Sequence, residues 1–547
     1  MTKTESTLET RKAALGRESS VDTSTRTLRR GLGQAGVQRA AFALPAVIAL
    51  VLSCIDLTGR SIWLDESATA SIASQNGTAL WHAIAHDGGN MSGYYLILHL
   101  LFAAFGDGLV VMRIPSAIAT GVTVFLVSLL TNRLFGKTAA FVAGLLGAVS
   151  LPLVFWGQDA RGYALMVTFV TASFYFLVEL DRRVAARASI RSAWIGYLVT
   201  TTLAAYMSYV ALLAVLAQLV WVVLARRPLR AVAQALAISV VLWVPLVILA
   251  VNRGTGQLDW LSRPGIGALA VVVATIASAS QQPDIHQTAT SNALETLTAV
   301  VVLGVLVLAV LFAREKESRR QLGLLASWIA VPVLLAFAES YAAQPVFLSR
   351  NLLMCVPPVG IVASLAVVEP RIPRGLGVGA LAVVAGLRIA QVVPSYAESP
   401  ENWRAATAYV VARSSPLDCV AFYPSDGRQA FDYYVLHTSG DLAIAPHPVL
   451  PPLSLRVIRP YVEVYTTVSS ATIRALQISC ARLWVVSSHT GSPEGTASSK
   501  THYLRYEQLL TRLGRAFAPV RVANFGWAYP VRVELFSSAA VVQGRRA

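Results

Sequence analysis

IPSAIATGVTVFLVSLLT, residues 114–131, runs for eighteen consecutive positions without a charged side chain. An α-helix of that length is about 27 Å long, close to the roughly 30 Å hydrocarbon core of a bilayer. The sequence therefore predicts that this segment crosses a membrane, and that the chain is a polytopic α-helical membrane protein. Further apolar runs of similar length occur at 40–57, 138–155, 163–180, 229–251, 293–312, 322–337 and 352–368.

The composition supports this prediction. Of the 547 residues, 55% are hydrophobic and only 14% are charged, whereas a soluble domain is about a quarter charged. The net charge of +16 does not indicate nucleic-acid binding, because no basic patch interleaved with aromatic residues lies on a soluble segment. We expect lipid, and not nucleic acid, to cover much of the chain.

The positive charges predict the topology. Lys and Arg gather in short connectors between the apolar runs, and the positive-inside rule places these connectors in the cytoplasm. If either of two short apolar segments, 94–105 and 266–279, crossed the membrane, basic connectors that follow it would lie outside the cytoplasm. We therefore expect both segments at the outer interface. The protein is then expected in the plasma (inner) membrane, with its N-terminus cytoplasmic. The expected spans, about eleven, are 40–57, 112–133, 137–155, 162–181, 193–206, 208–225, 229–251, 293–313, 320–341, 350–369 and 375–393.

Three regions follow from this pattern. Residues 1–39 are expected to be a disordered basic cytoplasmic tail, because they contain few large apolar side chains. Residues 40–393 are expected to form the transmembrane domain, with a long external loop at 58–111. Residues 394–547 alternate helical and strand patterns, which predicts an extracytoplasmic α/β domain. Its expected helices lie near 401–413, 427–436 and 503–515, and its strands near 419–423, 482–487 and 531–536.

Cys419 and Cys480 are the two cysteines of this external region. Disulfides form in oxidising compartments, and both residues lie at or near candidate strands of one small sheet. We predict that they are bridged.

Polar residues cluster where the apolar runs meet the external side. Asp65 and Glu66 follow the first span, Asp159 and Arg161 lie in the next external turn, and Arg350 begins a later span. Ionisable groups at this depth are costly, and for that reason they are usually functional. Carboxylates can deprotonate a hydroxyl or hold a divalent cation, and arginine suits a phosphate. This combination fits the transfer of a group from a lipid phosphate to a hydroxyl.

Several ordered motifs resemble the C-type glycosyltransferase superfamily (GT-C), in particular its family 39-like branch. Relatives of that branch are the protein O-mannosyltransferases and the lipid A aminoarabinose transferases, and the tail after residue 400 is similar to that of actinobacterial members. The motifs are Trp63-Leu64-Asp65-Glu66, Tyr94-Tyr95 with His99, Arg113-Ile114-Pro115-Ser116-Ala117, Arg133-Leu134-Phe135-Gly136 and Gln158-Asp159-Ala160-Arg161-Gly162-Tyr163-Ala164.

The resemblance implies a GT-C fold, a polyprenyl-phosphate sugar donor and a cell-envelope acceptor on the outer face. It also implies that Asp65 is the catalytic base, so Asp65 and Glu66 are the expected catalytic pair. The expected substrate-binding residues are Asp159, Arg161, Tyr163, Arg350 and His86.

Each of these residues also has a simpler interpretation. Asp65 and Glu66 can cap the helix that follows them, Asp159 and Arg161 can form a structural ion pair, and Arg350 can extend to the interface. His82 and His86 have the i, i+4 spacing of metal ligands, but position 83 is Ala, so the zinc-protease motif is absent. We expect His86 to shape the substrate loop.

The predicted function is an inverting glycosyltransferase of the membrane. No cofactor is required by the sequence, a divalent cation (Mg²⁺ or Mn²⁺) is compatible with it, and the identity of any metal ligand is unknown. The alternative is a transporter or lipid-binding membrane protein with a periplasmic accessory domain. A transporter should carry paired repeats and charges near the bilayer midplane, whereas the acidic residues here lie at the outer ends of spans.

Overall fold

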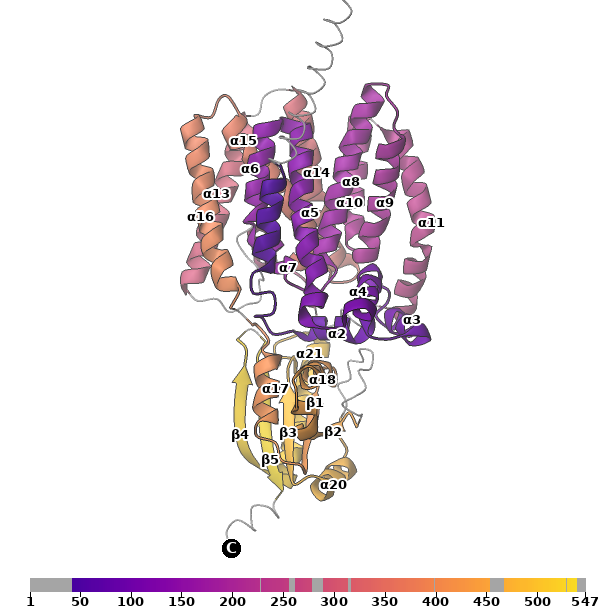
Figure 1. The fold of residues 1–547 in the computed structure, drawn as a ribbon, viewed down its shortest axis with the longest axis vertical. Helices are drawn as coiled ribbons and strands as arrows, with labels where there is room; N and C mark the ends of the chain where they lie inside the picture. Colours follow the sequence, from indigo (N-terminus) through magenta and orange to yellow (C-terminus); the bar gives the residue numbers. More distant parts are fainter. Residues whose placement is uncertain are drawn as a thin grey trace, which may run out of the picture.

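The computed structural model describes residues 42–226, 228–254, 261–277, 289–312, 316–397, 399–452, 467–527 and 529–538. The expected tail at 1–39 lies outside these residues. Figure 1 shows a large helical part and, at one end of it, a smaller part built around a sheet.

Seven helical segments in the described part of the chain are long and apolar enough to cross a bilayer. An eighth span is formed if α6 (Lys137–Ala148) and α7 (Leu151–Gly157), which meet at a 56° bend, count as one. This confirms a polytopic helical membrane protein with seven to eight candidate spans. The seven are α5 (Leu109–Phe135), α8 (Tyr163–Ala185), α11 (Leu229–Arg253), α13 (Ala289–Phe312), α14 (Lys316–Ala342), the 3₁₀ turn η2 (Ser349–Cys355) continued by α15 (Val356–Val368), and α16 (Arg374–Ser395).

Helices also lie at the other three predicted spans, but they are shorter: Phe42–Cys54, α9 (Arg191–Met207) and α10 (Ala211–Ala225). About eleven spans were predicted, whereas seven to eight helices in the described residues are long and apolar enough to cross a bilayer. The other three are too short, because a helix of 13 to 17 residues rises only about 20–26 Å. The two segments expected at the outer interface are short helices, α4 (Ser92–Phe105) and α12 (Ile266–Ile276).

The external loop predicted at 58–111 is largely helical. It contains α2 (Leu64–Ala73), α3 (Gly77–His86) and α4, which lie at the end of the helical part that faces the sheet (Figure 1). Asp65 and Glu66 occupy the first turn of α2, where carboxylates interact favourably with the helix dipole.

The C-terminal part is a mixed five-stranded sheet in the order β2-β1-β3-β5-β4. The first three strands in that order are parallel, and the last two are antiparallel to their neighbours. The predicted strands and helices of this region are confirmed, whereas β2, β4, α19 and α20 were not predicted. The strands are β1 (Asp418–Tyr423), β2 (His447–Leu450), β3 (Arg482–Ser487), β4 (Phe517–Phe525) and β5 (Val531–Ser538), and the helices are α17 (Trp403–Val411), α18 (Gly427–His437), α19 (Asp441–Ile444), α20 (Ser470–Ser479) and α21 (Ala497–Ala516).

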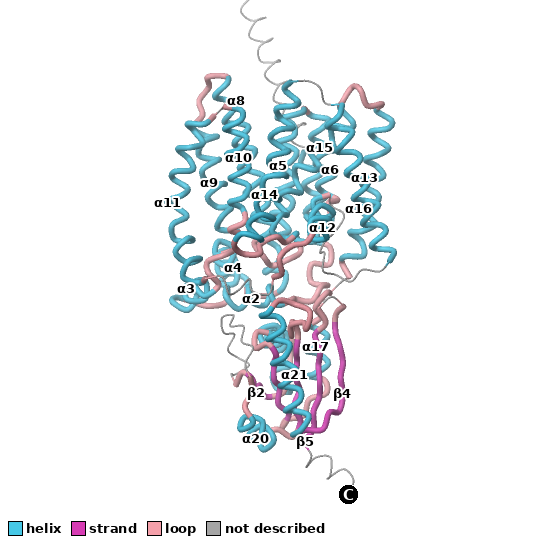
Figure 2. The backbone as a smooth tube through the Cα atoms, turned by 180° about the vertical axis from the view of Figure 1, so that it is seen from behind, coloured by secondary structure: helices cyan, strands magenta, loops and turns pink. Residues whose placement is uncertain are grey.

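Helices cover both faces of this sheet. Val420 and Phe422 of β1 belong to the apolar core beneath α17 and α18, while Ala421 packs in the opposite core beneath α20 and α21. This alternation follows from the two-residue period of a strand. Helix α17 lies in front of the sheet in Figure 1, and α21 lies in front in the reversed view of Figure 2.

The predicted disulfide is present. Cys419 and Cys480 are bonded, with their Cα atoms 5.6 Å apart. The bond joins β1 to the residue after α20, so it fastens the end of that helix to an inner strand of the sheet. Of the other two cysteines, Cys355 is buried and Cys54 is partly buried.

The two parts of the molecule share one hydrophobic core. Ile62 and Met112 of the membrane part are fully buried in the same cluster as Trp403, Phe431 and Trp484 of the C-terminal part. The sheet domain is therefore packed directly against the loop that carries Asp65 and Glu66.

Candidate active site

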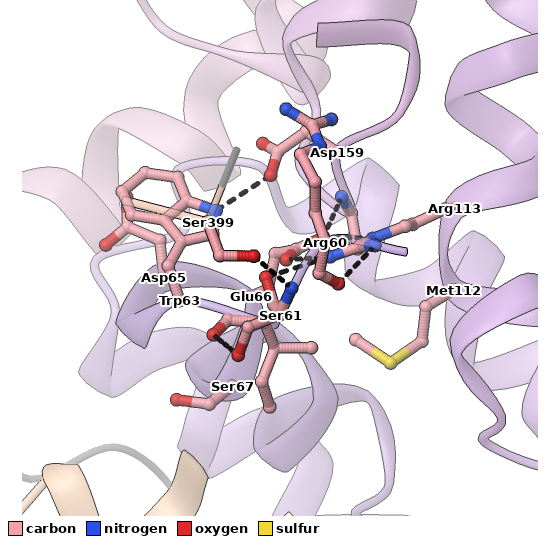
Figure 3. Close-up of polar contacts among 12 residues, drawn as sticks. Arg60, Ser61, Trp63, Asp65, Glu66, Ser67, Met112, Arg113, Asp159 and Ser399 are labelled. Carbon is pink, nitrogen blue, oxygen red and sulfur yellow. Dashed lines mark hydrogen bonds and ion pairs between the residues drawn. The ribbon is translucent and has the colours of Figure 1, made fainter. Parts of the chain in front are cut away.

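Glu66 is held by a buried arginine. Its two carboxylate oxygens lie 2.8 Å and 2.6 Å from Nε and Nη2 of Arg113, and both side chains are almost fully buried (Figure 3). One oxygen also accepts a hydrogen bond of 2.8 Å from the backbone N–H of Ala160. Glu66 therefore joins α2 to α5 and to the turn before α8. The geometry favours a positioning role for Glu66, and its predicted catalytic role stays a prediction.

Arg113 also fixes the backbone that leads into α2. Its guanidinium donates hydrogen bonds to the carbonyl oxygens of Leu57, Arg60 and Ser61. The C-terminal part holds the same segment from the other side, because Arg404 donates to the carbonyl oxygens of Thr58 and Gly59.

Two more residues of the C-terminal part bind the backbone that leads into α2. The hydroxyl of Tyr434 accepts a hydrogen bond of 2.8 Å from the N–H of Ile62. The carboxylate of Glu401 accepts one of 3.2 Å from the N–H of Leu64, the first residue of α2. The start of α2 is thus positioned by side chains from both parts of the molecule.

Asp65 is more accessible than Glu66, with 33% of its side chain exposed. Its carboxylate lies 3.7 Å from Nη2 of Arg161. Arg161 is fixed in turn by hydrogen bonds to the backbone carbonyl of Asp65 and to the hydroxyls of Thr69 and Tyr95. Asp65 is therefore the acid of the pair that solvent and a substrate can reach.

Asp159 is buried between Trp63 and the Glu66 carboxylate. Its Oδ1 accepts a hydrogen bond of 2.7 Å from the indole N–H of Trp63 (Figure 3), while its Oδ2 is buried with no hydrogen-bond partner among the described residues. Burial, together with the nearby negative charge of Glu66, raises the pKa of Asp159 to about 7. Asp159 is thus able to change its charge near neutral pH.

Arg350 and Tyr163 join the same cluster. The Arg350 guanidinium lies 5.7 Å from the centre of the Trp63 ring, within cation–π range. Arg350 interacts electrostatically with Asp65 and Tyr163. The structure therefore brings together five residues that the sequence placed in one site: Asp65, Asp159, Arg161, Tyr163 and Arg350.

His86 does not join this cluster by any contact among the described residues. It ends α3, where partial burial and the positive charge of Arg253 lower its pKa. Its predicted substrate-binding role stays a prediction. No group of three or more His, Cys, Asp or Glu side chains in the described ranges is placed to hold a metal ion. The predicted compatibility with a divalent cation stays a prediction.

Glu401 and His489, which the C-terminal part contributes, are not among the site residues expected from the sequence. His489 follows β3, lies 2.7 Å from Glu401, and stacks on Tyr529 with ring centres 4.7 Å apart. Burial lowers the pKa of His489, but the carboxylate of Glu401 outweighs it, so the pKa is raised overall. His489 also interacts electrostatically with Asp65. Spacing along the chain carries no signal for these contacts, because Glu401 and His489 are 88 positions apart and lie in different elements.

Residues 92–250 match the profile of a family described as dolichyl-phosphate-mannose-protein mannosyltransferase. A comparison with curated protein sequences gives no match.

Two solved structures are similar in fold. ArnT from Cupriavidus metallidurans, bound to undecaprenyl phosphate, has a TM-score of 0.50 and 13% identity, covering 90% of this chain and 97% of that chain. The archaeal oligosaccharyltransferase AglB from Archaeoglobus fulgidus, in complex with an inhibitory peptide and a dolichol-phosphate, has a TM-score of 0.52 and 12% identity, covering 89% of this chain and 73% of that chain. At such identities the likeness shows the fold alone.

These comparisons confirm the expected GT-C fold but give no support to an actinobacterial type. The family match lies on α4 to α11, which include the turn that carries Asp159 and Arg161. The profile match shows that residues 92–250 are similar to the dolichyl-phosphate-mannose-protein mannosyltransferases, and the likeness to the two solved structures shows that the whole chain shares their membrane fold.

Proposed function

We propose that the protein transfers a sugar from a polyprenyl phosphate to an acceptor hydroxyl on the outer face of the plasma membrane. The observation that carries this proposal is the pairing of one accessible carboxylate, Asp65, with two arginines, Arg161 and Arg350, at the same end of the helical part. A carboxylate is suited to accept a proton, and arginine is suited to hold a phosphate.

In the proposed reaction the acceptor oxygen attacks C1 of the donor sugar while Asp65 removes its proton. The bond between C1 and the phosphate oxygen breaks, and the electron pair leaves with the polyprenyl phosphate. The leaving phosphate is already ionised, so it needs its charge stabilised rather than a proton. Arg350 and Arg161 supply that stabilisation, and the configuration at C1 inverts.

Glu66 and Arg113 have a supporting role in this scheme. Their buried ion pair fixes the first turn of α2, and with it the direction in which Asp65 points. Catalytic groups must be held close to a productive geometry, and a small displacement can reduce the rate about 100-fold.

The orientation of the chain is part of the proposal. The basic connectors predict a cytoplasmic N-terminus, which puts α2, α3, α4 and the sheet domain on the extracytoplasmic side. Acceptors on that side include envelope glycans, lipids and proteins.

The test uses purified full-length protein in lipid nanodiscs. It is incubated with undecaprenyl-phosphate-linked radiolabelled sugars and with envelope material from a strain that lacks the gene, and label in the acceptor fraction is measured. Arg350→Ala should raise the KM for the donor about 10- to 100-fold, because it removes charge-assisted hydrogen bonds to phosphate. Arg374→Ala, an exposed arginine at the start of α16, is the matched control. Failure of the wild-type protein to transfer label from any donor would refute the proposal.

A further inference from the structure

A groove opens between the membrane part and the sheet domain. It has a volume of about 490 Å³, within the usual range of ligand sites of about 300–1,000 Å³. Three segments line it: the residues before α12, the residues before η2, and the loop between β3 and α21. We define the junction groove by its lining residues, of which Ser262, Arg263, Gln344, Glu494 and Thr496 are polar or charged and Leu261, Pro345 and Gly495 are not.

Hydrogen bonds hold the walls of the junction groove in place. The hydroxyl of Tyr341 donates to the carbonyl of Pro264, which joins α14 to the segment before α12. The hydroxyl of Ser499 accepts from the N–H of Ser492, and its backbone N–H donates to the hydroxyl of Thr496. The groove is therefore bounded by ordered segments on both sides.

Two segments that line the junction groove also carry residues near the candidate active site. Pro345 precedes Arg350 by five residues, and Glu494 follows His489 by five residues, so each pair is separated by at most about 18 Å. Arg350 and His489 both interact electrostatically with Asp65. Two of the segments that line the groove therefore also carry a residue that interacts with the proposed base.

The topology of the sheet independently favours a ligand at this edge. From β1 the chain passes to β2 on one side and then to β3 on the other, so the strand order reverses between β1 and β3. In open α/β sheets, ligands bind at the carboxyl ends of the strands where the order reverses. The loop that carries His489 and Glu494 begins at the carboxyl end of β3.

The chemistry of the lining points to a carbohydrate. Glu494 accepts hydrogen bonds, Arg263 donates them, and Gln344 and Thr496 do both, which matches the many hydroxyls of a glycan. An extended peptide would need a free strand edge, and all lining residues lie in loops or turns.

We propose that the junction groove binds a glycan acceptor, with its reacting hydroxyl at Asp65 and the following sugar units between Arg263 and Glu494. This inference rests on the proposed function, because it assigns the acceptor class of the same site. Its consequence is a dependence on acceptor length, since only an acceptor of several sugar units reaches both Asp65 and the groove.

The experiment measures acceptor KM against acceptor length. The acceptors are oligosaccharides released from the envelope of a strain that lacks the gene, fractionated from one to six sugar units, and the donor is the active undecaprenyl-phosphate sugar. The test variant carries both Arg263→Gln and Glu494→Gln. Its acceptor KM, divided by the acceptor KM of wild type, should rise with the number of sugar units and reach about tenfold for the longest acceptors. Glu507→Gln with Arg521→Gln, two exposed residues elsewhere in the sheet domain, is the matched control.

The outcomes separate the two proposals. If the wild-type protein transfers sugar but the groove variant has the same KM as the control at every length, the acceptor groove is refuted and the proposed function stands. Transfer to envelope proteins alone, with none to oligosaccharides, also overturns the groove. If the wild-type protein transfers nothing from any donor, even to water, the proposed function fails and the groove with it.

Discussion

Oε2 of Glu66 lies 2.6 Å from Nη2 of Arg113, and both side chains are almost completely buried. The preceding residue, Asp65, is one-third exposed and lies 3.7 Å from Arg161. Two adjacent acids on one turn of α2 therefore occupy different environments. We infer that Glu66 holds the turn and that Asp65 performs the chemistry.

Replacing Glu66 should reduce stability. In Glu66→Gln the guanidinium of Arg113 would remain buried without its counter-charge, and breaking a buried pair typically costs about 3–5 kcal/mol. Thermal unfolding in nanodiscs should therefore show a lower melting temperature. Glu507→Gln, an exposed carboxylate on α21, should leave it unchanged. Equal melting temperatures for both variants would contradict the structural role of Glu66.

Asp65→Asn should abolish transfer without unfolding the protein. An amide cannot accept the acceptor's proton at neutral pH, and loss of a general base typically reduces the rate about 10²–10⁴-fold. Asparagine retains the size of aspartate, so the start of α2 should stay intact. The measurement is kcat with a polyprenyl-phosphate sugar, together with the melting temperature. A near wild-type kcat would rule out Asp65 as the base.

The raised pKa of Asp159 predicts that the stability of the folded protein depends on pH. Its pKa is raised from the ordinary value of 3.8 to about 7, so the folded protein favours the neutral carboxyl. Between these two values the unfolded chain binds fewer protons at this group than the folded chain, and stability is lost as the pH rises. Asp159→Asn removes the titrating group and should be progressively more stable than wild type from pH 5 to pH 8. A constant difference in melting temperature over that range would show that Asp159 does not titrate there.

The contact between His489 and Glu401 predicts a second loss of stability as the pH rises, at a different group. Because the pKa of His489 is raised above 6.5, the contact contributes fully below pH 6.5 and is lost as the pH rises through the raised value. Wild type should be more stable than His489→Gln at pH 6, and the difference should disappear in alkaline solution. The readout is the melting temperature of both proteins from pH 6 to pH 9, and persistence of the difference at pH 9 would contradict an ionic contact.

Thiol labelling checks the proposed orientation. Ala188 and Ala497 are exposed residues in the connector after α8 and at the start of α21. In a background with Cys54→Ala and Cys355→Ala, an impermeant thiol reagent applied to intact cells should label Ala497→Cys but not Ala188→Cys. Labelling of Ala188→Cys alone would show that the topology is the reverse of the one proposed.

The sequence alone determined the class of fold and much of the site. Uncharged runs such as residues 114–131 are long enough to span a bilayer, and the alternation of apolar residues after residue 400 has the period of strands. Asp65, Asp159, Arg161 and Arg350 were selected because ionisable residues at the ends of spans are costly. The structure places all four residues in one cluster, because the helix ends that carry them lie at the same end of the helical part.

Only the tertiary structure separated the two adjacent acids and supplied the contacts from the sheet domain. The sequence gives no indication that Arg113 turns toward Glu66, or that Glu401 reaches the N–H of Leu64 across 337 positions. Hydrophobic periodicity reports which face of a segment is buried, but not which distant side chain it meets. Packing decided that Glu66 is enclosed by Arg113 and Ala160, that Asp65 stays accessible, and that side chains of the sheet domain hold the segment at residues 58–64.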